Sequence, residues 1–87
     1  MVSKKIVVTN ESGLHARPAS VLAHAAMKCD SNVTIVTPDR SLNPKSILNI
    51  MAAAIKKGTE IELQCEGETE VEDLNILATL IESGLGE

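Results

Sequence analysis

Gly13-Leu14-His15-Ala16-Arg17-Pro18 is the stretch that organises this sequence, because its glycine and proline mark a turn followed by the start of a helix. Proline fits the first helical turn, where its missing N–H would have no partner anyway. His15 is therefore predicted at or just before that turn, where unpaired N–H groups and the positive end of the helix dipole favour an anion. Arg17 adds a planar guanidinium that suits phosphate oxygens. The stretch predicts an anion-binding histidine at a helix start.

The composition predicts one small domain, residues 1–87, and argues against several classes of protein. Hydrophobic residues make up 44% of the chain and aromatic residues 0%, so we expect a purely aliphatic core. A net charge of −4 argues against a nucleic-acid partner, which normally meets a basic surface. The sequence has no long apolar run and no N-terminal signal pattern, so we expect a cytoplasmic protein without membrane insertion.

The two cysteines indicate neither a metal site nor a redox site. Cys29 and Cys65 lie 36 positions apart, and the sequence has no CxxC motif. Cys65 alternates with Ile61 and Leu63 and is expected in the core, whereas Cys29 has no evident role. We expect no metal and no cofactor.

Apolar periodicity predicts four strands and three helices in the order β-α-β-β-α-β-α. The expected strands are residues 4–9, 33–37, 40–42 and 60–65. The expected helices are residues 16–28, 47–55 and the segment that starts after Thr69 and ends at Ser83-Gly84. Helices interleaved with short strands in this way indicate an α+β fold, a two-layer sandwich.

The first and last helices each show one apolar face. In the first helix the face expected in the core consists of Ala16, Ala19, Ala23, Ala26 and Met27, with Leu22 on its flank. Its polar side consists of Arg17, Ser20 and His24, and we interpret His24 as a solvated or partner-rim residue rather than a catalytic one. In the last helix the expected face consists of Val71, Leu74, Leu77, Ala78 and Ile81. Thr69 and Glu72 have the spacing of a capping box at the start of this helix.

The middle helix is too apolar for a helix with a single buried face. Ser46 is a good N-cap for it, and helix stability alone accounts for that serine. One apolar stripe consists of Ile47, Ile50 and Ala54, and the other of Leu48, Met51 and Ile55. One stripe must be core. The other is either core as well or an exposed patch on which a partner docks.

The stretch Gly13-Leu14-His15-Ala16-Arg17-Pro18-Ala19-Ser20 resembles the active-site signature of the histidine-containing phosphocarrier proteins (HPr) of the bacterial sugar phosphotransferase system. Residues 43–51 are similar to the second signature of that family, around its regulatory serine, and residues 81–87 to its usual ending. The resemblance covers the whole chain. It implies an open-faced sandwich in which helices cover one face of a four-stranded antiparallel sheet, and a monomer.

The resemblance also implies a function and the residues that perform it. His15 would accept a phosphoryl group on Nδ1 from phosphorylated Enzyme I and pass it to the IIA domains of sugar permeases. The backbone amides of Ala16 and Arg17 would hold the group, with no metal and no cofactor. Partners would dock on the residues that match the docking positions of the family: Ser20, Ile47, Leu48 and Met51. The protein would be a carrier in a relay rather than an independent enzyme.

For Ser46 the resemblance adds a second role to helix capping. In many Gram-positive bacteria an ATP-dependent kinase, HPr kinase/phosphorylase, phosphorylates the matching serine, and a transcriptional regulator is a further implied partner. Phosphocarriers from bacteria without that kinase carry the serine too. Pro44 and Asn49, which flank Ser46 here, depart from the family pattern, as does Cys29, where the family usually has an aromatic residue.

The sequence leaves two other functions open. The first is a purely regulatory binding module that acts through Ser46 and the apolar helix without carrying a phosphoryl group. Related modules of that kind typically lack the active histidine, so His15 counts against it. The second is a small metal or redox protein, which the absence of clustered Cys or His ligands in the sequence disfavours.

Overall fold

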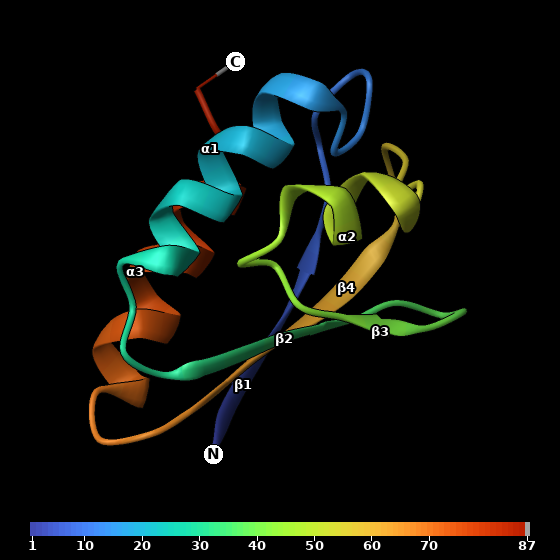
Figure 1. The fold of residues 1–87 in the computed structure, drawn as a ribbon. Coiled ribbons are helices and arrows are strands. Elements are labelled where there is room, and N and C mark those ends of the chain that lie inside the picture. Colours follow the sequence, from blue (N-terminus) through green and yellow to red (C-terminus); the bar gives the residue numbers. More distant parts are fainter. Residues whose placement is uncertain (87) are drawn as a thin grey trace.

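Three helices lie on one face of a four-stranded antiparallel sheet in the computed structural model, which describes residues 1–86 (Figure 1). The elements are β1 (Val2–Val7), α1 (Ala16–Met27), β2 (Asn32–Val36), β3 (Ser41–Leu42), α2 (Ile47–Ala52), β4 (Glu60–Glu66) and α3 (Glu70–Glu82). The element order and the open-faced α+β sandwich predicted from the sequence are confirmed. The predicted domain end at Glu87 lies outside the described residues.

The sheet has the strand order β1-β4-β2-β3, so β4 pairs with β1 on one side and with β2 on the other. Along β4 the residues Ile61, Leu63 and Cys65 are buried against the helices, while Glu62 and Gln64 lie partly exposed on the opposite face. This alternation is the reason that only one face of the sheet carries helices. Cys65 is in the core, as predicted.

The buried side of α1 differs from the predicted face at three positions. Leu22, expected on the flank, is fully buried, whereas Ala16 is exposed and the Met27 side chain is 53% exposed. The core stripe follows Ala19, Leu22, Ala23 and Ala26, which recur at helical spacing. Met27 lies about 100° around the helix from Ala26 and so points away from the sheet. The predicted polar side is confirmed, because Arg17 and His24 are exposed and Ser20 is partly exposed.

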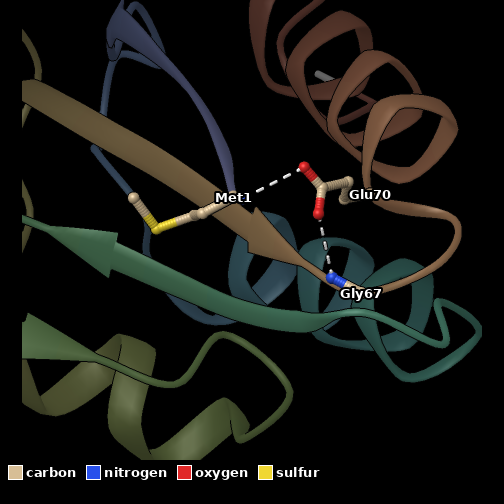
Figure 2. A network of polar contacts seen from close by, with 3 residues as sticks. All are labelled: Met1, Gly67 and Glu70. Carbon is tan, nitrogen blue, oxygen red and sulfur yellow. Dashed lines mark hydrogen bonds and ion pairs between the residues drawn. The ribbon is translucent and has the colours of Figure 1, made fainter.

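The capping box predicted at the start of α3 is wrong. Thr69 is the N-cap residue, but its backbone angles (φ −106°, ψ 25°) are not extended and its side chain makes no cap hydrogen bond. Glu70, and not Glu72, bonds to a backbone N–H that precedes the helix. Its carboxylate accepts the Gly67 N–H at 3.2 Å and pairs with the Met1 ammonium at 3.2 Å (Figure 2). These contacts, the Gly67 N–H first, lower the pKa of Glu70.

Asp73 takes a buried position in α3, whereas Val71, predicted on the core face, is 59% exposed. Asp73 Oδ2 accepts hydrogen bonds from the Ser31 N–H (3.1 Å), the Ser31 hydroxyl (2.5 Å) and the Thr69 hydroxyl (2.8 Å). The Ser31 hydroxyl is the main cause that lowers the pKa of Asp73. Three donors to one carboxylate oxygen compensate for its burial, so Asp73 ties α3 to the loop between α1 and β2.

Lys45 holds the same loop from the other side. Its Nζ donates to the carbonyl oxygens of Cys29 (3.1 Å) and Ser31 (2.9 Å). Because Lys45 directly precedes Ser46, the start of α2 is anchored to the end of α1 and the beginning of β2. The loop at residues 29–31 therefore connects all three helices.

The middle helix is shorter than predicted and ends at Ala52. Ile50 is fully buried and Ile47 packs against the core, while Leu48 is 79% and Met51 41% exposed. This confirms that one stripe is core, and of the two alternatives left open for the other stripe the structure shows the exposed one at Leu48 and Met51. The prediction is wrong for the last residue of each stripe, because Ala54, grouped with the core stripe, is exposed and Ile55, grouped with the exposed stripe, is buried. Both lie beyond the end of the helix, so helical spacing no longer sets their direction.

Candidate functional site

His15 is the N-cap residue of α1 and is exposed. Its backbone is extended (φ −84°, ψ −168°), and its side chain makes no cap hydrogen bond. The first intrahelical bond runs from the Ala19 N–H to the His15 carbonyl oxygen at 2.8 Å. The N–H groups of Ala16 and Arg17 precede that bond and have no acceptor within the helix. As predicted, the histidine sits at a helix start whose backbone donors remain open.

Two contacts fix the loop that carries His15. The Gly13 N–H donates to the Asn10 carbonyl at 2.9 Å, and the Leu14 N–H donates to the Ile55 carbonyl at 2.9 Å. Gly13 has φ +68°, and a Cβ there would overlap the Ile55 carbonyl oxygen. Glycine is therefore required both for its backbone conformation and for this close approach. The buried Leu14 side chain completes the anchor, and the imidazole remains on the surface.

A shallow hollow of about 220 Å³ opens beside His15. Its wall is formed by Ser12, Leu14, His15, Met51, Ala54, Ile55 and Lys56. The start of α1 and the exposed side of α2 thus meet at one place, although they are far apart in the sequence. The structure brings His15 and Met51, two residues predicted from different motifs, into the same site.

Arg17 supplies a free cation on the exposed side of α1. Among residues 1–86 its guanidinium has no hydrogen-bond or ion-pair partner. A guanidinium without an internal carboxylate is available to an external anion, and phosphate oxygens suit its planar fork. The first turn of α1 also contains no acidic residue that would repel such an anion.

Ser46 caps α2 with its own side chain. Its Oγ accepts the Asn49 N–H at 3.2 Å and the Asn49 side-chain amide at 3.2 Å. The predicted N-cap is confirmed. Asn49, a departure from the family pattern, adds the second of these bonds. Ser46 is partly exposed and comes two positions before the exposed Leu48.

His24 and Cys29 lie away from this site, in the wall of a second hollow of about 460 Å³ between α1 and α3. The Cys29 thiol donates to the Ala25 carbonyl at 3.5 Å, and burial is the main cause that raises its pKa to about 11. Such a thiol is not a reactive thiolate near neutral pH. Within residues 1–86 no three side chains of His, Cys, Asp or Glu are grouped so that they could hold a metal ion.

This chain is similar to a family of known proteins over nearly its whole length. The family model described as "PTS HPr component phosphorylation site" matches residues 2–83. This chain belongs to the HPr family. It is therefore a phosphocarrier protein of the phosphotransferase system and not an independent enzyme. Phosphocarrier protein HPr of Mycoplasma capricolum is 45% identical over 86 residues, which cover 98% of this chain and 97% of that protein.

Two solved HPr-like structures show the same fold. HPr-C-His from Thermoanaerobacter tengcongensis is 37% identical with a TM-score of 0.94, covering 100% of this chain and 98% of that one. Crh, the Bacillus subtilis catabolite repression protein, is 36% identical with a TM-score of 0.76, covering 97% of each chain, and is described as a domain-swapped dimer. None of the helices in residues 1–86 is long and apolar enough to cross a membrane.

Lys56, in the wall of the hollow beside His15, is absent from the site residues that the sequence predicts. One signal in the sequence does point to it. All eight Lys and Arg residues lie in residues 1–57, together with only three of the twelve acidic residues. The other nine acidic residues lie in residues 58–87. The basic part of the chain, residues 1–57, is thus the part that contains both His15 and Lys56.

Proposed function

We propose that His15 accepts a phosphoryl group from phosphorylated Enzyme I and passes it to the IIA domains of sugar permeases. The observation that carries the proposal is the open start of α1: His15 is exposed, uncapped and followed by two amides without intrahelical acceptors. The family signature around His15 supports the same assignment. We assign the whole chain, residues 1–87, to one phosphocarrier domain that acts in the cytoplasm as a monomer.

The transfer needs little from the protein beyond a nucleophile and a place for the charge. A neutral imidazole attacks phosphorus through Nδ1, and the bond from phosphorus to the donor breaks as the new P–N bond forms. The amides of Ala16 and Arg17, the helix dipole and the Arg17 guanidinium then stabilise the charge on the phosphoryl oxygens. These contacts must also let the group leave, because a carrier that holds its phosphoryl group too tightly cannot donate it.

We propose the exposed side of α2 as the docking surface for both kinds of partner. Leu48 and Met51 are large, apolar and exposed, and Met51 reaches the hollow that contains His15. Ile47 borders them, and Ser20 lies on the exposed side of α1. A flexible methionine suits a surface that must fit more than one partner.

Ser46 supports a second, regulatory proposal: phosphorylation by an ATP-dependent kinase, HPr kinase/phosphorylase, with a transcriptional regulator that reads the modified form. Ser46 is partly exposed and stands at a helix start, where a phosphate group is electrostatically favoured. The modification would add negative charge at the start of α2, the helix that carries Leu48, and so weaken docking on that apolar surface.

The test is phosphorylation by purified Enzyme I, phosphoenolpyruvate and Mg²⁺. We expect one acid-labile phosphate per chain, lost in His15→Ala and retained in His24→Ala, the variant of the only other histidine. Equal labelling of His15→Ala and the unchanged protein would contradict the site assignment. An acid-stable phosphate from ATP and the kinase, lost in Ser46→Ala, would support the regulatory proposal. If the protein took up only the acid-stable phosphate and none from Enzyme I, its function would be that of a regulatory binding module and not that of a carrier.

A further inference from the structure

Lys56 stands beside the loop that carries His15, and the main chain fixes it there. The segment that follows α2 turns at Ala54, which has φ +51°, a left-handed conformation that a non-glycine residue rarely adopts. The turn brings the Ile55 carbonyl to the Leu14 N–H at 2.9 Å. A Cβ placed on Gly13 would lie 2.8 Å from the Lys56 Cα. The backbone of Lys56 is therefore packed against the residue two positions before His15.

Strained backbone of this kind persists only where neighbouring contacts impose it, and it is concentrated at functional sites. At Ala54 the effect of the strained turn is to place residues 54–56 in the wall of the hollow beside His15. Of the side chains in that wall only two ionise, those of His15 and Lys56. The hollow is therefore lined by both the proposed phosphoryl acceptor and a lysine.

The next residue, Lys57, provides a comparison within the same segment. Lys57 Nζ pairs with Glu11 Oε1 at 2.7 Å, and Lys57 does not line the hollow. Lys56, in contrast, is exposed and has no ion-pair or hydrogen-bond partner among residues 1–86. Two consecutive lysines thus differ in that one is neutralised by a neighbour and the other is free.

We propose that Lys56 is a second cationic ligand of the phosphoryl group on His15, which it approaches from the segment after α2 while Arg17 approaches from α1. The proposal rests on the proposed function of His15. A phosphoryl group carries between one and two negative charges near neutral pH, more than the half-charge of a helix start balances. A lysine that lines the hollow can bring its positive charge to the phosphoryl oxygens from a segment other than α1. No covalent step involves Lys56, which contributes charge alone.

The test is a ³¹P NMR titration of the phosphorylated protein, compared between the unchanged chain, Lys56→Gln and Lys57→Gln. Removing a cation from the phosphoryl oxygens favours the less charged form, so in Lys56→Gln we expect the second pKa of the phosphoryl group to rise by about half a unit. Lys57→Gln, which removes the same charge one residue away, should leave that pKa unchanged. Lys56→Arg should restore it.

A second readout is the equilibrium constant for phosphoryl transfer from phosphorylated Enzyme I to this protein. In Lys56→Gln this constant should fall by about threefold, so that more of the phosphoryl group stays on Enzyme I. Equal pKa values and equal equilibria in the two glutamine variants would overturn the role of Lys56 while leaving His15 as acceptor. A ³¹P signal that survives in His15→Ala would overturn the proposed function itself. The two failures are therefore distinguishable in the same set of samples.

Discussion

The starts of α1 and α2 differ in what happens to their unpaired backbone N–H groups. Both have unpaired backbone N–H groups, as every helix start does. At α2 the Ser46 side chain accepts the Asn49 N–H, and the preceding Lys45 ties the segment to residues 29–31. At α1 the N-cap is His15, whose side chain accepts nothing, and the third helical residue is Pro18, which has no N–H to satisfy.

The difference indicates that the two helix starts are built for different purposes. The start of α2 is closed by its own sequence and contributes to stability. The start of α1 gives up a cap worth about 1 kcal/mol and keeps its donors for an external anion. Closing the open start, or loosening the closed one, is the way to test this contrast.

The largest effect is expected from closing the start of α1 with His15→Asp. Aspartate is a strong N-cap and here can accept the Arg17 N–H, so the free energy of unfolding should rise by about 0.5 kcal/mol or more. Phosphoryl acceptance from Enzyme I should be abolished. Thermal unfolding and a phosphorylation assay measure the two quantities on the same sample. If His15→Asp were less stable than the unchanged chain, the backbone N–H groups at the start of α1 would not be available to an acceptor.

The next largest effect is expected at Asp73, which anchors the loop that Lys45 also holds. Asp73→Ala leaves the buried donors of Ser31 without their acceptor, so the free energy of unfolding should fall by about 2 kcal/mol. Glu72→Ala removes the neighbouring exposed carboxylate and should change stability by less than about 0.5 kcal/mol. Denaturant unfolding compares the two variants. Equal stabilities would show that the Asp73 contacts do not anchor the loop.

The same carboxylate gives a pH dependence with a definite sign. The folded pKa of Asp73 is lower than its unfolded value, which is about 3.9. Its contribution to stability is therefore complete above that unfolded pKa and is lost as the pH falls through the folded pKa. Urea midpoints measured between pH 6 and pH 2, values chosen to bracket an ordinary Asp pKa of about 3.9, should fall more steeply for the unchanged chain than for Asp73→Asn. Parallel curves would contradict this assignment.

A smaller effect is expected from opening the start of α2. Ser46→Ala removes the cap and should lower the free energy of unfolding by about 1 kcal/mol. Ser46→Asp retains a capping oxygen and should stay within about 0.5 kcal/mol of the unchanged chain. Urea denaturation separates the two variants. If Ser46→Ala were as stable as Ser46→Asp, the closed start of α2 would contribute nothing.

The smallest effect on stability is expected on the exposed side of α2. Leu48 is 79% exposed, so Leu48→Ala should change the free energy of unfolding by less than about 0.5 kcal/mol. It should nevertheless slow phosphoryl transfer from Enzyme I, because it removes part of the proposed docking surface. Ile76→Ala, an equally conservative change at an exposed apolar residue of α3, is the matched control and should leave the transfer rate unchanged. Equal rates for both variants would exclude Leu48 from docking.

Local signals in the sequence were sufficient for most of the fold. Gly13 and Pro18 mark the start of α1, Ser46 marks that of α2, and the alternation around Leu63 predicts the buried side of β4. The signature around His15 predicts the family, and the family model and full-length relatives show it.

What the sequence did not predict depends on tertiary contacts. Asp73 displaces Val71 from the buried side of α3 because Ser31, 42 positions earlier, supplies its donors. The place of Lys56 depends on the left-handed turn at Ala54 and on the contact of that segment with Gly13. Neither periodicity nor turn propensity reports such contacts.

The most direct test of the open helix start is the ¹H–¹⁵N spectrum before and after phosphorylation by Enzyme I and phosphoenolpyruvate. We predict a phosphoryl group on a ring nitrogen of His15 and the largest changes in backbone amide chemical shift at Ala16 and Arg17. The chemical shift of the Asn49 amide, at the closed start of α2, should not change. A phosphoryl group on any other residue, or unshifted Ala16 and Arg17 amides, would contradict the account.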